Sequence, residues 1–203
     1  MSGSICKEKA KELLKKEWVM AFVILLIYSA IMAGLGTITG GIGSLLLGSC
    51  LLIAVYNVFI NAYHGKKYEV TDMLEGWNEG LSNRICLSLL KNVYIALWSL
   101  LFIIPGVVKS YSYFLAEFIS RKHPEMTATE CITESRKIMN GHKWELFVFQ
   151  FSFIGWYLLG VITCGIAYIW VLPYVMQATV IYVEENIYKV NKDEPLKVEV
   201  INE

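Results

Sequence analysis

The chain has 203 residues, 56% of them hydrophobic, and its 18 basic side chains are balanced by 18 acidic ones. Without a net positive charge it has no general attraction for nucleic acid, and we expect no nucleic-acid partner. The charges fall into a few clusters and leave apolar runs of about 20 residues, the length that crosses a hydrocarbon core about 30 Å thick. The sequence therefore predicts an all-α integral membrane protein, whose first partner is the lipid bilayer.

Six apolar segments predict about six transmembrane helices paired as three hairpins. The links within each pair are short and uncharged, whereas the connections between pairs are long and basic. A single polytopic membrane domain, residues 1–188, would carry the hairpins, and a polar tail would follow at 189–203. The hairpins cover about 18–63, 85–120 and 144–187, and the segments are 18–38, 42–63, 85–104, 107–120, 144–162 and 165–187.

Lysine and arginine set the expected orientation, because they are in excess in cytoplasmic loops. With six crossings, the basic groups before the first segment, after the second, after the fourth and after the sixth all fall on one side. Both termini are then cytoplasmic. Lys91 and Lys109 are the two basic residues that this scheme does not accommodate.

A short amphipathic stretch precedes each hairpin, at residues 4–18, 70–84 and 127–144. In the third, Thr127 and Glu130 have the spacing of a capping box. Three such stretches in equivalent positions favour helices lying in the headgroup layer, and ordinary solvated linker helices are the alternative.

Two parts of the chain align without gaps, residues 70–106 with residues 128–164. Trp98 falls on Trp156 in this alignment. The match indicates a diverged parallel repeat of the kind found in some transporters. A chance match between two apolar segments is the alternative.

The fourth segment, 107–120, rises only about 21 Å as a helix and is too short for a straight crossing. Three explanations are open: the bilayer thins, the helix continues through residues 121–123, or the Pro-Gly turn before it lies below the outer headgroups. Lys109, Tyr113 and Glu117 would share one face of a continuous helix. They belong to a candidate polar stripe within the membrane, formed by Lys91, Asn92, Lys109, Tyr113 and Glu117. In the alternative, Lys109 reaches out to the headgroups and Glu117 marks the inner interface.

No pattern typical of catalysis or of metal binding is present. The three histidines are scattered among the connections, and the five cysteines include no C-x-x-C pair. We therefore expect no enzyme, no catalytic residue, no metal and no cofactor. The second candidate site is a basic cytoplasmic surface that would bind anionic lipid or a membrane protein, formed by Arg136, Lys137, His142 and Lys143.

Three stretches, LWSLLFIIPGVVKSYSYFLAEFI (97–119), SRKIMNGHKWELF (135–147) and FSFIGWYLLGVITCGIAYIWVLPY (151–174), carry a family resemblance. Together they resemble the hallmark motifs of a bacterial membrane family filed as domain of unknown function 975. The resemblance covers most of the chain from about residue 60 onward. It implies a multi-pass protein of the bacterial plasma membrane and carries over no chemistry.

Two functions follow as hypotheses. The first is a non-enzymatic envelope protein that binds anionic lipid or a membrane partner through the basic surface. The second is a small transporter or exporter subunit that uses the polar stripe. The sequence leaves the substrate, the partner and the oligomeric state open.

Overall fold

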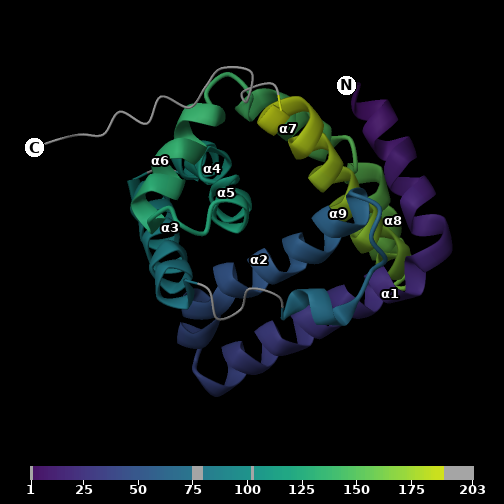
Figure 1. Ribbon diagram of the computed structural model, residues 1–203, viewed down its shortest axis with the longest axis horizontal. Coiled ribbons are helices and arrows are strands. Elements are labelled where there is room, and N and C mark those ends of the chain that lie inside the picture. Colours follow the sequence, from purple (N-terminus) through teal and green to yellow (C-terminus); the bar gives the residue numbers. More distant parts are fainter. Residues whose placement is uncertain (1, 75–79, 102, 190–203) are drawn as a thin grey trace, which may run out of the picture.

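The computed structural model describes residues 2–74, 80–101 and 103–189, and every regular element in these ranges is helical. The all-α class is therefore confirmed. In Figure 1, the α1 helix descends on the right from the N-terminus and then follows the lower edge, and α2 runs diagonally above it. The α3 to α6 helices gather on the left, and the later helices lie on the right.

The first expected hairpin is formed by α1 (Gly3–Ile38) and α2 (Ile42–Tyr63). Gly40 and Gly41 have φ of +60° and +92° in the turn between the two helices, a backbone region open to glycine without steric cost. The α1 helix includes the first amphipathic stretch and changes direction at Glu17, whose φ and ψ are −129° and 25°.

The N-terminal half of α1 packs inside the protein. Its stripe of Cys6, Ala10 and Leu14 is almost fully buried, as the i, i+4, i+8 spacing allows. The partner is α9 (Tyr168–Tyr182), and the rings of Trp18 and Trp170 stack with their centroids 6.3 Å apart. This amphipathic stretch therefore covers another helix with its apolar face.

The second expected hairpin is divided into more pieces than the sequence predicts. After the 3-10 turn η1 (Val70–Met73), the helices are α3 (Leu81–Leu101), α4 (Ile103–Ser112) and α5 (Ala116–Lys122). Residues 75–79, within the second amphipathic stretch, lie outside the described residues. The prediction of one continuous helix over 107–120 is wrong, because residues 113–115 form a turn between α4 and α5.

A serine from a distant helix stabilises this break. The Ser135 hydroxyl donates to the Ser112 carbonyl at 2.8 Å and accepts from the Leu115 N–H at 3.2 Å. These are backbone groups that a break in a helix deprives of regular partners. The two hydrogen bonds of Ser135 therefore offset the free-energy cost of interrupting the helix inside the protein.

The third amphipathic stretch forms α6 (Ala128–Ile138), and the predicted capping box is confirmed. Thr127 Oγ1 accepts from the Glu130 N–H, and the Glu130 carboxylate accepts from the Thr127 N–H at 2.7 Å. These hydrogen bonds lower the pKa of Glu130. The buried face of α6 packs against α3 and α5.

Thr127→Ala should lower the free energy of unfolding by about 1 kcal/mol, because it removes the acceptor for an N–H of the first helical turn. Thermal unfolding of the detergent-solubilised protein measures the change. Thr133→Ala is the matched control, since Thr133 is exposed within the same helix. Equal effects of the two substitutions would contradict a stabilising cap.

The third expected hairpin consists of α7 (Lys143–Phe151), α8 (Ile154–Ile162), α9 and the π-helical turn η2 (Val183–Tyr188). Between α7 and α8 lies Phe153, whose fully buried ring packs edge-on against Tyr174 of α9.

Three helical stretches are long and apolar enough to cross a membrane: Glu17–Ile38, Ile42–Tyr63 and Lys143–Ile162. Only 11% of the first and 22% of the third are buried inside the protein, so both offer apolar side chains to lipid. These stretches indicate a location in a membrane. The α4 and α5 helices have 10 and 7 residues and are shorter than a crossing of about 20 residues.

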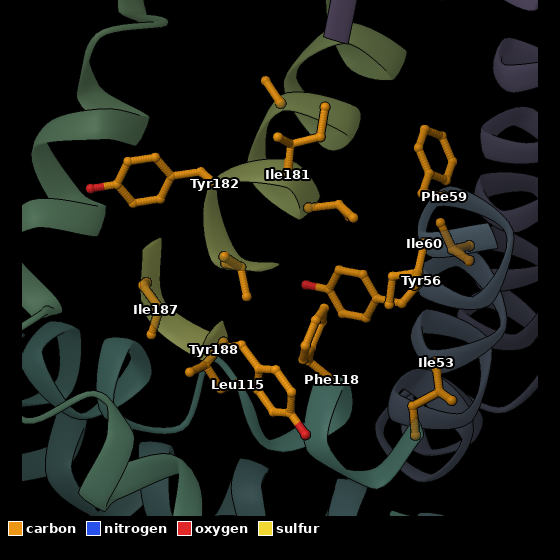
Figure 2. Packing of buried hydrophobic residues seen from close by; sticks show 14 of the residues in the cluster. Ile53, Tyr56, Phe59, Ile60, Leu115, Phe118, Ile181, Tyr182, Ile187 and Tyr188 are labelled. Carbon is orange, nitrogen blue, oxygen red and sulfur yellow. The ribbon is translucent and has the colours of Figure 1, made fainter. Parts of the chain in front are cut away.

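One part of the hydrophobic core lies where α2, α5 and η2 meet. Figure 2 shows the ring of Phe118 close to those of Tyr56 and Tyr188, and its centroid lies 6.4 Å and 5.3 Å from theirs. Both contacts have the edge-to-face geometry that aromatic rings favour. They fix α5 between two other elements and so determine where its charged side chains lie.

Candidate functional site

Glu117 of α5 is the centre of a buried polar site. Its side chain is 2% exposed, and Oε1 accepts a hydrogen bond from Ser49 Oγ of α2 at 3.1 Å. The same oxygen forms an ion pair with Lys91 of α3, whose side chain is 18% exposed. Among the described residues, Oε2 of Glu117 has no hydrogen-bond partner. One lysine therefore supplies the compensating charge for this buried carboxylate.

Two polar side chains of α3 hold it against α2 beside this ion pair. Ser88 Oγ donates to the Leu45 carbonyl at 2.6 Å, and Asn92 Nδ2 donates to the same oxygen at 3.2 Å. Asn92 thus joins two helices, which is the usual role of an amide between membrane helices.

A second polar group lies further along α2. The Arg121 guanidinium of α5 donates to Asn57 Oδ1 at 2.8 Å and to Asn61 Oδ1 at 3.0 Å. Both amides also donate to Asp72, Asn57 to its carbonyl oxygen and Asn61 to its carboxylate. Glu117 and Arg121, one helical turn apart on α5, therefore both face α2.

The predicted polar stripe is only partly brought together. Lys91 and Glu117 pair, and Asn92 lies next to Lys91 in α3. The prediction that Lys109, Tyr113 and Glu117 share a continuous helical face is wrong, because the turn at 113–115 intervenes. The Lys109 ammonium lies over the Trp98 ring, 4.5 Å from its centroid, and the Tyr113 ring lies 6.0 Å from that of Tyr94.

Lys109 instead belongs to a second site, which we call the basic cluster: Lys109, Arg136 and Lys143. The α4 helix is held against α7 by Tyr111, whose hydroxyl lies 2.9 Å from Gln150 Oε1 and whose ring packs on Phe147. The end of α4 is held against α6 through the Ser112–Ser135 hydrogen bond. These contacts place α4 beside α6 and α7, the helices that carry Arg136 and Lys143. Lys109 is close enough to both for their positive charges to act on its ammonium.

The four residues of the predicted cytoplasmic surface divide into two kinds. Lys137 lies 3.7 Å from the Glu134 carboxylate, and His142 Nδ1 lies 3.0 Å from that of Glu145. Within the part of the chain that the structure describes, Arg136 and Lys143 form no ion pair, and neither does Lys109. The basic cluster is therefore a concentration of uncompensated positive charge.

Sequence reasoning missed that Lys109 belongs to this cluster. The sequence predicts a turn at Pro105 and Gly106, shortly before Lys109, whereas the structure places both residues within α4. A continuous crossing after such a turn would separate Lys109 from Arg136 and Lys143 by most of the membrane. No local spacing links residue 109 to residues 136 and 143. The contact depends on the break between α4 and α5.

The described residues thus define an all-helical protein with three candidate membrane-crossing stretches and two sites of charged side chains between its helices. Residues 101–190 match the model of the family described as "Protein of unknown function (DUF975)". The match confirms the resemblance and includes Glu117 and the whole basic cluster, whereas Ser49 and Lys91 precede it. No curated protein and no solved structure matches the chain.

Proposed function

We propose that the protein is a non-enzymatic, multi-pass protein of the bacterial plasma membrane that binds anionic lipid through the basic cluster. One observation carries this proposal: three helices contribute three positive charges that form no ion pair among the described residues. Like charges held together are unfavourable unless an anion compensates them. Anionic lipid headgroups supply such anions at the cytoplasmic surface, where basic residues are in excess.

The proposal includes a membrane arrangement. Both termini and the connection that contains Arg136 face the cytoplasm, as the distribution of basic residues favours. The proximity of Lys109 to Arg136 and Lys143 supports a shallow α3–α4 hairpin over a hairpin with two complete crossings. The expected third and fourth crossings then become one segment that enters the membrane from the cytoplasmic side.

Lipid retention tests the proposal. The purified protein is incubated with mixed micelles of neutral and anionic lipid, and the anionic lipid that stays bound is quantified. Lys109→Gln, Arg136→Gln and Lys143→Gln should each weaken retention about fivefold, since a basic residue near a charged surface contributes about 1 kcal/mol.

Lys137→Gln is the matched control. Lys137 directly follows Arg136, but its side chain is 64% exposed and lies near Glu134. Its substitution should leave retention close to that of the unmodified protein. If all four variants retain lipid as the unmodified protein does, the basic cluster is not the binding site.

A second candidate function is transport through the site around Glu117. The observation that favours it is an ion pair buried between α3 and α5 and hydrogen-bonded to α2, which is itself long and apolar enough to cross a membrane. Proteoliposomes should then show solute flux that Glu117→Gln abolishes. Absence of flux for a panel of small ions and amphiphiles would count against transport.

A further inference from the structure

The number of charges in the basic cluster bears on which anion it binds. Lys109, Arg136 and Lys143 supply three positive charges, and the carboxylates nearest in sequence, Glu134 and Glu145, lie beside Lys137 and His142 instead. A phosphodiester headgroup carries one negative charge and would compensate only one of the three. A phosphomonoester carries between one and two charges near neutral pH and compensates more of the cluster.

The hydrogen-bond donors point to the same chemistry. Each of the three residues comes from a different helix, α4, α6 or α7, and each carries charged hydrogen-bond donors. A terminal phosphate has three oxygens that can accept charge-assisted hydrogen bonds, whereas a phosphodiester has two that are not esterified. Arg136 can engage two oxygens at once through its planar fork.

Aromatic side chains next to the cluster favour a lipid as the source of the phosphate. Lys109 lies over the ring of Trp98, and Trp144, which directly follows Lys143, is 70% exposed. Tryptophan is enriched where a membrane meets water, because its ring is apolar and its N–H is polar. A free phosphate ion would gain nothing from these rings.

We infer that the basic cluster binds the phosphomonoester headgroup of a membrane lipid in preference to a phosphodiester headgroup. The inference rests on the proposed function, since it names the lipid class that the same site would take. The three helices then act as a clamp around one terminal phosphate, with Trp98 and Trp144 beside the glycerol and acyl region.

Vesicle binding tests the inference. The protein in detergent is titrated with phosphatidylcholine vesicles that contain either phosphatidic acid or phosphatidylglycerol, matched for total surface charge. The unmodified protein should bind the phosphatidic acid vesicles about tenfold more tightly, the gain expected from one additional charge-assisted hydrogen bond. Lys109→Gln, Arg136→Gln and Lys143→Gln should reduce this ratio towards one, whereas Lys137→Gln should leave it unchanged.

Arg136→Lys is a control that distinguishes loss of binding from loss of folding. It keeps the charge but loses the planar fork, so it should bind both vesicle types and show a reduced preference. Equal binding of the two vesicle types by the unmodified protein would overturn the inference and leave the proposed lipid binding standing. If the protein binds neither vesicle type, both the inference and the proposed lipid binding are wrong. Competition by inorganic phosphate at concentrations comparable to the lipid would overturn the choice of a lipid source.

Discussion

Replacing Lys91 by methionine should lower the free energy of unfolding by about 3 to 5 kcal/mol, because it leaves a buried carboxylate without a compensating charge. Glu117→Leu should lower the free energy of unfolding by a smaller amount. The side chain of Lys91 is 18% exposed, against 2% for Glu117, so the lysine left behind can reach water more easily. The double substitution, Lys91→Met with Glu117→Leu, should be less destabilising than Lys91→Met alone, because it leaves neither charge unpaired.

Unfolding in mixed micelles, followed by loss of helical circular dichroism as the denaturing detergent is increased, measures these differences. Lys137→Met is the matched control. It removes an exposed lysine whose carboxylate neighbour is 3.7 Å away, and its effect should stay below about 0.5 kcal/mol. If Lys91→Met and Lys137→Met behave alike, the ion pair contributes nothing measurable to the fold.

The second large effect is expected in thiol labelling of intact cells. In a background that lacks the native cysteines, the Lys109→Cys variant should react with a membrane-impermeant maleimide only after permeabilisation. The reason is that Lys109 lies on α4, which is held against the helices of Arg136 and Lys143, on the side that the basic residues assign to the cytoplasm. Because the reagent either reaches the thiol or does not, the difference should be nearly all or none.

Two control positions define the outcomes of the labelling experiment. Lys66→Cys lies in the connection after α2 and should also require permeabilisation. Ile38→Cys lies at the turn between α1 and α2, at the opposite end of α2 from Lys66. It replaces a side chain that is 86% exposed and should react from outside. Labelling of the Lys109→Cys variant from outside would favour the arrangement with two complete crossings and contradict the shallow hairpin.

Local features of this fold are predictable from the sequence. The first hairpin follows from two apolar runs separated by glycine-rich residues, and the capping box follows from the spacing of Thr127 and Glu130. Each depends on residues within a few positions of one another, so periodicity and turn chemistry are sufficient to find it.

The break between α4 and α5 could not be predicted in this way. It is stabilised by Ser135, which lies 20 positions beyond Leu115 in the chain. Seen alone, residues 107–120 have the composition of a continuous apolar helix. Only the packing of α6 against this segment supplies the hydroxyl that satisfies the interrupted backbone.

The same limit applies to the candidate sites. Lys91 and Glu117 were both recognisable as charges within apolar segments, but sequence spacing linked Glu117 to Lys109 along one helix. The true partner of Glu117 comes from a neighbouring helix, 26 positions away. Helical periodicity relates residues within a helix, whereas the pairing of charges between helices depends on how those helices pack.

The packing of the first helix against one of the last has a consequence for biosynthesis. A chain made from its N-terminus exposes the stripe of Cys6, Ala10 and Leu14 long before the ribosome reaches Trp170 and the rest of α9. Until then, this half of α1 lacks the surface that it covers in the finished protein. The order of synthesis therefore makes α9 the element that completes folding, and a chain that ends before it would leave an apolar helix face available to chaperones and proteases.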